Sequence, residues 1–433
     1  MHYKNFLILT LLLLFTGCLN KGHSPMAGTV SEMSMPSMSR EADMAIPPPA
    51  PVATESTSVP KEELPPKPLP PKREVQSGML TAGEIDDNLN LEYFQKYVDK
   101  VLQRKKETPL PFISTKKRLK LKVVDRNNQA VNRAKVLVGS TTRYTNSAGI
   151  LHLFPSVDDT QNIDSITIAN QVVPINFDTT NEKTITINNS ATAVKSLDLM
   201  FVIDTTGSMS DEMEYLAKEF ESIVSNIKNK YPNVDIRFGL TLYKDKGDDY
   251  VVKDFAFTSE TQKMKEQLAA QSANGGGDYP EAMDKGIQKG LEASWAAEDG
   301  VRIMFLVADA PPHDEDMQKM LPLIKEARDK AVRVYPIGAS GVAEKAEFVM
   351  RHLALLTEGR HLFLTDDSGI GNSHEEPKVA CYQVTRLDQL IRRVLESELS
   401  GKRVEATKDE LIRTVGSYNN GICTPSKASN TNN

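Results

Sequence analysis

Three oxygen-bearing side chains follow one apolar segment in a pattern that suits a hard metal ion. Asp204, Thr206 and Ser208 supply one carboxylate and two hydroxyl groups at alternate positions. Mg²⁺, Mn²⁺ and Ca²⁺ prefer oxygen ligands of this kind. The same residue types are also ordinary in a turn between a strand and a helix, where Ser208 or Ser210 would cap the helix. From these residues alone, a cation site and a simple turn are both open interpretations.

The segment before Asp204 predicts where this turn lies. Residues 199–203 are apolar throughout, which is typical of a strand in a parallel sheet with helices on both faces. Asp204 is therefore expected at the carboxyl end of a strand. In open α/β sheets the loops at that edge converge around a crevice in which ligands bind.

Two later segments could share the same edge. A second apolar strand, residues 301–308, runs into Asp309-Ala-Pro-Pro-His313, and a glycine-rich loop, residues 274–281, precedes another helix. His313 is expected to be a surface or specificity residue, because a site of hard oxygen ligands does not need an imidazole. Three loops could thus meet at one rim.

The three motifs, in this order, resemble the metal-ion-dependent adhesion site of von Willebrand factor A domains. The resemblance covers about residues 196–400 and implies a doubly wound, Rossmann-like α/β fold. It further implies that Thr206 and Ser208 ligate the metal, while Asp204 and Asp309 hold it directly or through a second shell. The implied ion is Mg²⁺, with Mn²⁺ or Ca²⁺ as alternatives. The implied role is binding of a protein partner whose acidic side chain completes the coordination.

The glycine-rich loop departs from that family pattern. Adhesion sites usually take a Thr from this loop, but here Gly277 stands at that place, with Asp278 beside it. Asp278 is the best available oxygen donor, although it could instead cap the helix at Tyr279. As a hypothesis, a third carboxylate would bind the metal more tightly and make the site less attractive to an acidic partner.

Strand and helix patterns alternate through the rest of this region, which predicts a mostly parallel sheet. The expected helices are 210–231, 317–331, one running through 348–356, and 384–399; the expected strands are 234–243, 251–257 at an edge, 332–337 and 361–364.

The N-terminal segment predicts export and lipidation. Residues 1–17 have one Lys and an apolar core too short to span a membrane, as in a signal peptide. The small residues before Cys18 resemble the lipobox of bacterial lipoproteins, with an ordinary secretory signal as the alternative. Leu19 lacks the Asp that is associated with inner-membrane retention, so the expected location is the bacterial outer membrane, on its periplasmic or cell-surface side.

Four further segments complete the predicted organisation. Residues 18–78 are rich in Pro and Ser and are expected to form a disordered tether, and 79–112 are expected to contain a short amphipathic helix. Residues 116–190 alternate in short strands that predict a small all-β sandwich and resemble carboxypeptidase-regulatory-like domains. Residues 401–433 are a C-terminal tail.

Cysteine count and charge restrict the remaining possibilities. With Cys18 lipidated, Cys381 and Cys423 are an even pair that could form a disulfide in an oxidising compartment, or could stay unpaired. The formal net charge of -6 and the absence of aromatic residues among basic ones give no nucleic-acid signature. Three functions remain: a metal-dependent binding module without catalysis, a metal-dependent hydrolase, and a structural envelope protein with a vestigial site. The first is favoured, because no Ser-His-Asp or carboxylate-His cluster supplies a general base.

Overall fold

The computed structural model describes residues 75–105, 109–158, 160, 163–177, 181–190, 193–296 and 300–424. The predicted signal peptide, Cys18 and nearly all of the predicted tether lie outside this range. The described residues fall within one compact unit, Pro71–Asn433. In the part of the chain that is described, no helix combines the length and the apolar character that crossing a membrane requires.

A mixed nine-stranded sheet forms the centre of this unit, in the order β11-β10-β9-β12-β13-β14-β1-β15-β16. The five strands from β10 to β14 along this order are parallel, while β11, β1, β15 and β16 pair antiparallel with their neighbours. The α/β architecture is therefore as predicted. The strands are β1 (Thr81–Ile85), β9 (Ser196–Asp204), β10 (Asp235–Tyr243), β11 (Val252–Thr258), β12 (Gly300–Ala308), β13 (Val332–Gly338), β14 (His361–Thr365), β15 (Tyr382–Arg386) and β16 (Arg413–Val415).

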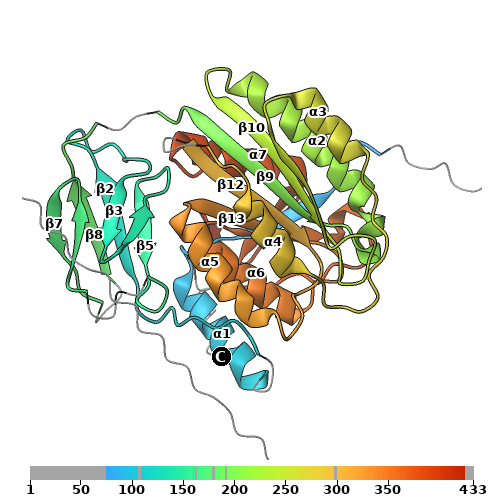
Figure 1. Cartoon of the computed structure of the whole chain (residues 1–433), viewed down its shortest axis with the longest axis horizontal. Coiled ribbons are helices and arrows are strands. Elements are labelled where there is room, and N and C mark those ends of the chain that lie inside the picture. The colour runs from blue at the N-terminus through green and yellow to red at the C-terminus, as the bar shows by residue number, and fades with distance from the viewer. Residues whose placement is uncertain are drawn as a thin grey trace, which may run out of the picture. The chain divides into compact units, whose positions relative to one another are not determined.

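Helices cover both faces of the sheet (Figure 1). One apolar cluster joins the sheet to α2 (Met213–Lys230), α3 (Thr261–Ala269) and α7 (Leu387–Ser400). The other joins it to α1 (Leu91–Arg104), α4 (Met283–Glu292), α5 (Met320–Asp329) and α6 (Glu344–Leu356). Strand β9 contributes Phe201 to the first cluster and Val202 to the second. Because successive side chains of a strand point to opposite faces, a strand covered on both sides must be apolar throughout, as residues 199–203 are.

The predicted elements between residues 210 and 399 agree with the structure except near their ends. The predicted helix 210–231 is a 3₁₀ turn, η1 (Gly207–Asp211), followed by α2. Further short turns are η2 (Met317–Lys319) and η3 (Asp366–Ser368). The predicted helix 384–399 begins too early, because Tyr382–Arg386 form β15 and the helix begins at Leu387. Val384 pairs with Gly83 of β1, a strand supplied from three hundred residues earlier in the chain.

The segment before the β-rich region contributes a strand as well as the predicted helix. Strand β1 lies between β14 and β15, and α1 packs against α6. Gly83 is required in β1, since a Cβ atom there would lie 2.4 Å from the Phe363 ring. The buried Glu219 of α2 accepts hydrogen bonds from the backbone N–H groups of Gly78, Met79 and Leu80. The last residues of the predicted tether are thus fixed to α2.

The strands β2 to β8 form two small sheets. They have the orders β5-β2-β8 and β4-β3-β6-β7, and apolar residues from both sheets form one buried cluster. Residues 145–149, between β4 and β5, form a turn. Membership of the carboxypeptidase-regulatory-like family stays a prediction. The strands are β2 (Leu119–Val124), β3 (Lys135–Val138), β4 (Thr141–Tyr144), β5 (Ile150–Leu153), β6 (Ser165–Ile168), β7 (Gln171–Pro174) and β8 (Asn181–Thr186).

A buried ionic contact joins these small sheets to α5, which packs against the central sheet. Asp158 accepts hydrogen bonds from Arg143 of β4 (2.7 Å from Nε to Oδ1) and from Arg328 of α5 (2.7 Å from Nη2 to Oδ2). All three side chains are nearly inaccessible to solvent. Because two cations share one carboxylate, the contact is geometrically specific.

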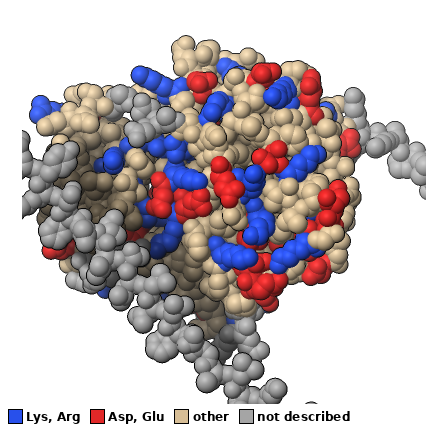
Figure 2. All heavy atoms as spheres, in the orientation of Figure 1, with Lys and Arg blue, Asp and Glu red and all other residues tan. Residues whose placement is uncertain are grey.

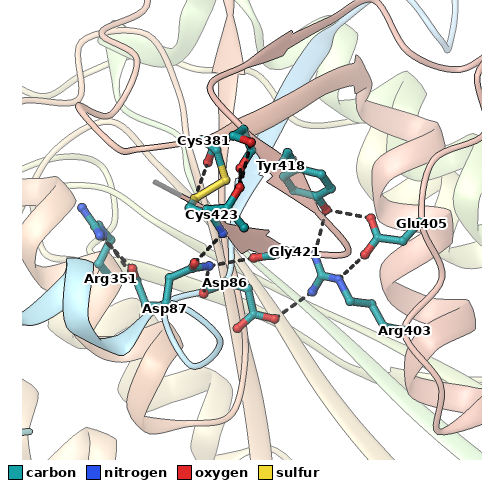
Figure 3. The surroundings of a disulfide bond; sticks show 12 residues. Asp86, Asp87, Arg351, Cys381, Arg403, Glu405, Tyr418, Gly421 and Cys423 are labelled. Atoms are coloured by element: carbon teal, nitrogen blue, oxygen red, sulfur yellow. Dashed lines mark hydrogen bonds and ion pairs between the residues drawn. A yellow bond between two sulfur atoms is a disulfide. The ribbon is translucent and has the colours of Figure 1, made fainter. Parts of the chain in front are cut away.

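The C-terminal segment is attached to the domain through a disulfide between Cys381 and Cys423, which confirms the predicted pair (Figure 3). A short hairpin, β17 (Tyr418–Asn419) and β18 (Ile422–Cys423), carries the second cysteine. The Cys423 backbone N–H donates to Asn90 Oδ1 at 2.8 Å, just before α1. In the same region Arg403 donates to Asp86 (2.7 Å) and to the Tyr418 hydroxyl (3.3 Å). Residues 401–424 are therefore packed on the domain rather than forming a free tail.

Removing this crosslink should destabilise the protein without altering the sheet edge that carries Asp204. The disulfide closes a loop across a sequence separation of 42 residues. Loss of such a closure costs about 3–4 kcal/mol in the chain-entropy model. We expect the double variant Cys381→Ser, Cys423→Ser to lose about that much free energy of unfolding in urea titrations. Reduction of the denatured wild-type protein should expose two additional thiols; an unchanged thiol count would contradict the crosslink.

Candidate metal centre

The turn after β9 is organised by hydrogen bonds to Asp204. Its Oδ1 atom accepts the backbone N–H of Thr206 (2.9 Å) and the Thr206 hydroxyl (2.6 Å). The Thr206 hydroxyl oxygen lies 3.2 Å from that of Ser208. No side-chain oxygen caps η1 or α2, and Ser208 and Ser210 lie within η1. The interpretation of this turn as a simple serine cap is therefore wrong.

Asp309 lies beside Asp204 because β12 is the sheet neighbour of β9. The two strands run parallel, with Val307 opposite Ile203, so their carboxyl ends coincide. The Asp309 carboxyl is buried. This is the arrangement expected from two apolar strands that each end on an Asp.

The glycine-rich loop lies between the other two loops. On one side the Gly207 N–H donates to the Gly275 carbonyl and the Asn274 N–H to the Thr205 carbonyl, both at 3.0 Å. On the other side the Glu281 N–H donates to the Pro311 carbonyl at 3.0 Å. The three predicted loops therefore share one rim.

Gly276 allows this loop to approach the turn closely. Its φ of +74° is in the left-handed region, and a Cβ atom there would lie 3.2 Å from the Thr206 Cβ. The Gly276 N–H donates to both oxygens of Asp248, at 3.1 and 2.9 Å. Because only glycine adopts this conformation at little cost, the loop depends on it.

Asp278 and Glu281, both in the glycine-rich loop, differ in their burial. Asp278 is exposed, and no contact of the described residues joins its carboxylate to Asp204, Thr206 or Asp309. Glu281, to which the sequence reasoning gave no role, is only 3% exposed. Its Oε1 atom would lie 3.0 Å from a Cβ built on Gly276, so it faces the turn that carries Thr206.

Each of three buried carboxyl groups at this rim has one oxygen without a hydrogen-bond partner: Asp204 Oδ2, Asp309 Oδ1 and Glu281 Oε2. Among the described residues, no Lys, Arg or His forms an ion pair with any of the three. His313, the imidazole at this rim, is instead paired with Asp245 at 2.5 Å. Buried carboxylates normally have donors or a cation, so these oxygens fit a bound metal ion.

The rim disfavours negative charge in the absence of a cation. Burial, and then the negative charge of Asp309, raise the pKa of Asp204, against the hydrogen bonds from Thr206. Burial also raises the pKa of Asp309, although hydrogen bonding from Ser208 acts in the opposite direction. Burial and the charges of Asp204 and neighbouring carboxylates raise the pKa of Glu281 to about 9. A dication would relieve the repulsion among these groups.

The carboxyl groups do not by themselves form a complete ligand set. Among the residues described, no three His, Cys, Asp or Glu side chains converge closely enough to hold a metal ion. The hydroxyl groups of Thr206 and Ser208 would have to bind the ion as well, with water in the remaining positions. Mg²⁺ commonly retains several waters when it binds a protein.

Residues 198–355 match the family model for the von Willebrand factor A domain. The chain contains a von Willebrand factor A (VWA) domain. The match includes Asp204, Thr206, Ser208 and Asp309, and it excludes β1, β14, β15 and β16. Those four strands extend the central sheet on the side of β13 that is away from β9.

Two curated proteins resemble the chain over part of their length. The alpha-protein kinase vwkA of Dictyostelium discoideum is 21% identical over 285 residues, which are 64% of this chain and 45% of the kinase. An ariadne-like RING finger protein, R811, of Acanthamoeba polyphaga mimivirus is 31% identical over 122 residues, 27% of this chain and 11% of that protein. The chain thus spans less than half of either relative.

Among solved structures, the pilus adhesin SpaC of Lactobacillus rhamnosus GG, in its open conformation, overlaps the chain with a TM-score of 0.31 at 15% identity. The overlap covers 38% of this chain and 27% of the adhesin.

The raised pKa values give the candidate site a defined pH dependence. Without metal, the folded protein keeps protons on Asp204, Asp309 and Glu281 to higher pH than the unfolded chain does, so their stabilising contribution is present at low pH and is lost as the pH rises. A metal ion must displace these protons. We expect the rise in melting temperature caused by Mg²⁺ to be larger at pH 8 than at pH 5.5, measured against EDTA at each pH. A rise that is equal or smaller at pH 8 would contradict this account.

Proposed function

We propose that the VWA domain binds one divalent cation, most simply Mg²⁺, and through it a protein partner. Thr206 and Ser208 would ligate the ion, and Asp204 and Asp309 would hold it directly or through bound water. The ion would supply an electrophilic position that an oxygen atom of the partner can occupy. The role is recognition or complex assembly rather than catalysis.

One observation carries this proposal: at a single rim, one buried carboxyl oxygen each of Asp204, Asp309 and Glu281 has no hydrogen-bond partner among the described residues. Asp204 ends β9, Asp309 follows β12, and Glu281 lies at the end of the glycine-rich loop, which is hydrogen-bonded to the segments after both strands. A fold that only needed a turn here would gain nothing from three buried acids, because an unpaired buried carboxyl destabilises it. The exposed Ser208 leaves one side of the rim accessible to a partner.

The charge distribution fits a protein partner better than a nucleic acid. Lys and Arg are interspersed with Asp and Glu on the face drawn in Figure 2, without a continuous basic stripe. The formal net charge is -6. Nucleic-acid binding depends on clustered positive charge, and neither the face drawn in Figure 2 nor the net charge indicates it.

We further propose that the chain is a cell-envelope lipoprotein, anchored through Cys18 in the bacterial outer membrane. The lipobox-like sequence supports this proposal, and so does the disulfide, since structural disulfides form in oxidising compartments. Metabolic labelling with a fatty acid should mark the wild-type protein and leave Cys18→Ala unlabelled. Equal labelling of both would contradict lipidation at this residue.

A pull-down from envelope extract tests metal-dependent binding. Wild-type protein should recover a partner in Mg²⁺ and lose it in EDTA, while Asp204→Ala should recover little in either condition, because it removes the carboxyl that organises Thr206. Asp278→Ala is the matched control from the same rim. Equal recovery of every protein by wild type and Asp204→Ala, with and without Mg²⁺, would contradict the proposed function.

A further inference from the structure

The glycine-rich loop carries two carboxylates near the candidate cation site, Asp278 and Glu281. The hydrogen bonds of the loop bury only Glu281. Asn274 and Gly275 are attached to the turn after β9, and Glu281 is attached to Pro311 in the loop after β12. The Tyr279 hydroxyl also donates to the Asp309 carbonyl at 3.1 Å. Asp278 lies between these two attachments and is exposed, whereas Glu281 is at the second attachment and is buried.

Two further acidic groups near this rim, Asp248 and Asp245, already have hydrogen-bond partners. Asp248 accepts the Gly276 N–H and the Asp245 N–H, and Asp245 pairs with His313. Glu281 differs from them, because its buried Oε2 atom has no partner. Its carboxylate therefore needs a donor that the described residues do not supply.

We propose that Glu281, and not Asp278, is the third carboxylate of the cation site. This inference rests on the proposed metal binding. Since the acidic side chains do not converge as a direct ligand set, Glu281 would act as a positioning residue that accepts a hydrogen bond from a metal-bound water. Metal-bound waters are strong donors, and Mg²⁺ keeps several of them.

This assignment changes the partner that the site prefers. Three carboxylates around a dication leave a net charge of about -1 at the rim. The open position would then attract another carboxylate less strongly than a site with two carboxylates and three hydroxyl groups does. We infer that the partner's donor is a neutral oxygen, such as a hydroxyl or amide carbonyl, rather than the acidic side chain implied by the family resemblance.

Titration of the purified full chain with MgCl₂ and MnCl₂, by calorimetry, tests the assignment. Glu281→Gln keeps the size of the side chain and removes its charge, and we expect it to weaken metal binding by about 10- to 100-fold, the usual effect of losing an outer-shell partner. Asp278→Asn is the matched control and should bind metal within about twofold of wild type, as for a carboxylate outside the site.

Melting temperature in EDTA supplies a second readout that a purely structural role would not produce. Removal of a buried, repelled carboxylate should raise the melting temperature of metal-free Glu281→Gln above that of wild type, while its gain on adding Mg²⁺ shrinks. A variant that only damages the fold would melt lower in both conditions, and that result would overturn the assignment.

The outcomes distinguish a failure of the Glu281 assignment from a failure of the proposed metal-dependent function. If wild type does not bind either metal, the proposed metal-dependent function fails. If wild type binds and Glu281→Gln binds equally well, metal binding stands and the assignment of Glu281 fails. If Asp278→Asn loses metal binding and Glu281→Gln does not, Asp278 is the third carboxylate of the cation site.

Discussion

Electrostatic repulsion among buried carboxyl groups is the main physical constraint on the loops at the carboxyl ends of the VWA strands. Asp204 and Asp309 lie at the ends of adjacent parallel strands, and Glu281 lies in the loop held between them. Among the described residues, no Lys, Arg or His forms an ion pair with any of these three groups. The glycines at 275 and 276, the Asp204–Thr206 hydrogen bonds and the Asp248 contacts all hold this unfavourable arrangement in place. A cation bound there, as proposed, would offset this repulsion.

The remainder of the chain reinforces the part of the domain away from that edge. Strand β1 completes the sheet between β14 and β15, and Glu219 fixes the chain just before it. The disulfide and the contacts of Arg403 hold the C-terminal segment against the same region (Figure 3). Segments from both ends of the described chain therefore complete the sheet beyond β14. They leave the loops after β9 and β12 available for binding.

Local patterns in the sequence predicted the parts of the site that depend on local structure. An apolar run that ends on Asp204 or Asp309 fixes a strand and its carboxyl end, so these residues, with Thr206 and Ser208, were predictable. Glu281 was not, because its burial depends on Pro311 in a distant loop. The signal for it was present, since it closes the Gly-Gly-Gly-Asp-Tyr-Pro-Glu motif just before α4. The prediction for Asp278 rests on its position in the loop, and that position does not indicate burial.

Long-range pairing explains the errors in the fold. Residues 382–386 have apolar spacing compatible with a helix, and their pairing with β1 and β16 makes them a strand. Residues 79–85 gave no strand signal of their own, because a short segment with two neighbours gains its structure from them. The α/β architecture was predictable, whereas the order of strands beyond β14 was not.

Anomalous diffraction from crystals of the full chain soaked in Mn²⁺ tests the central claim most directly. The account predicts a single strong peak at the rim, bonded to the hydroxyl oxygens of Thr206 and Ser208, with Asp204, Asp309 and Glu281 around it and its waters. An empty rim in crystals that bind Mn²⁺ elsewhere, with Asp204, Asp309 and Glu281 hydrogen-bonded only to the protein, would contradict it.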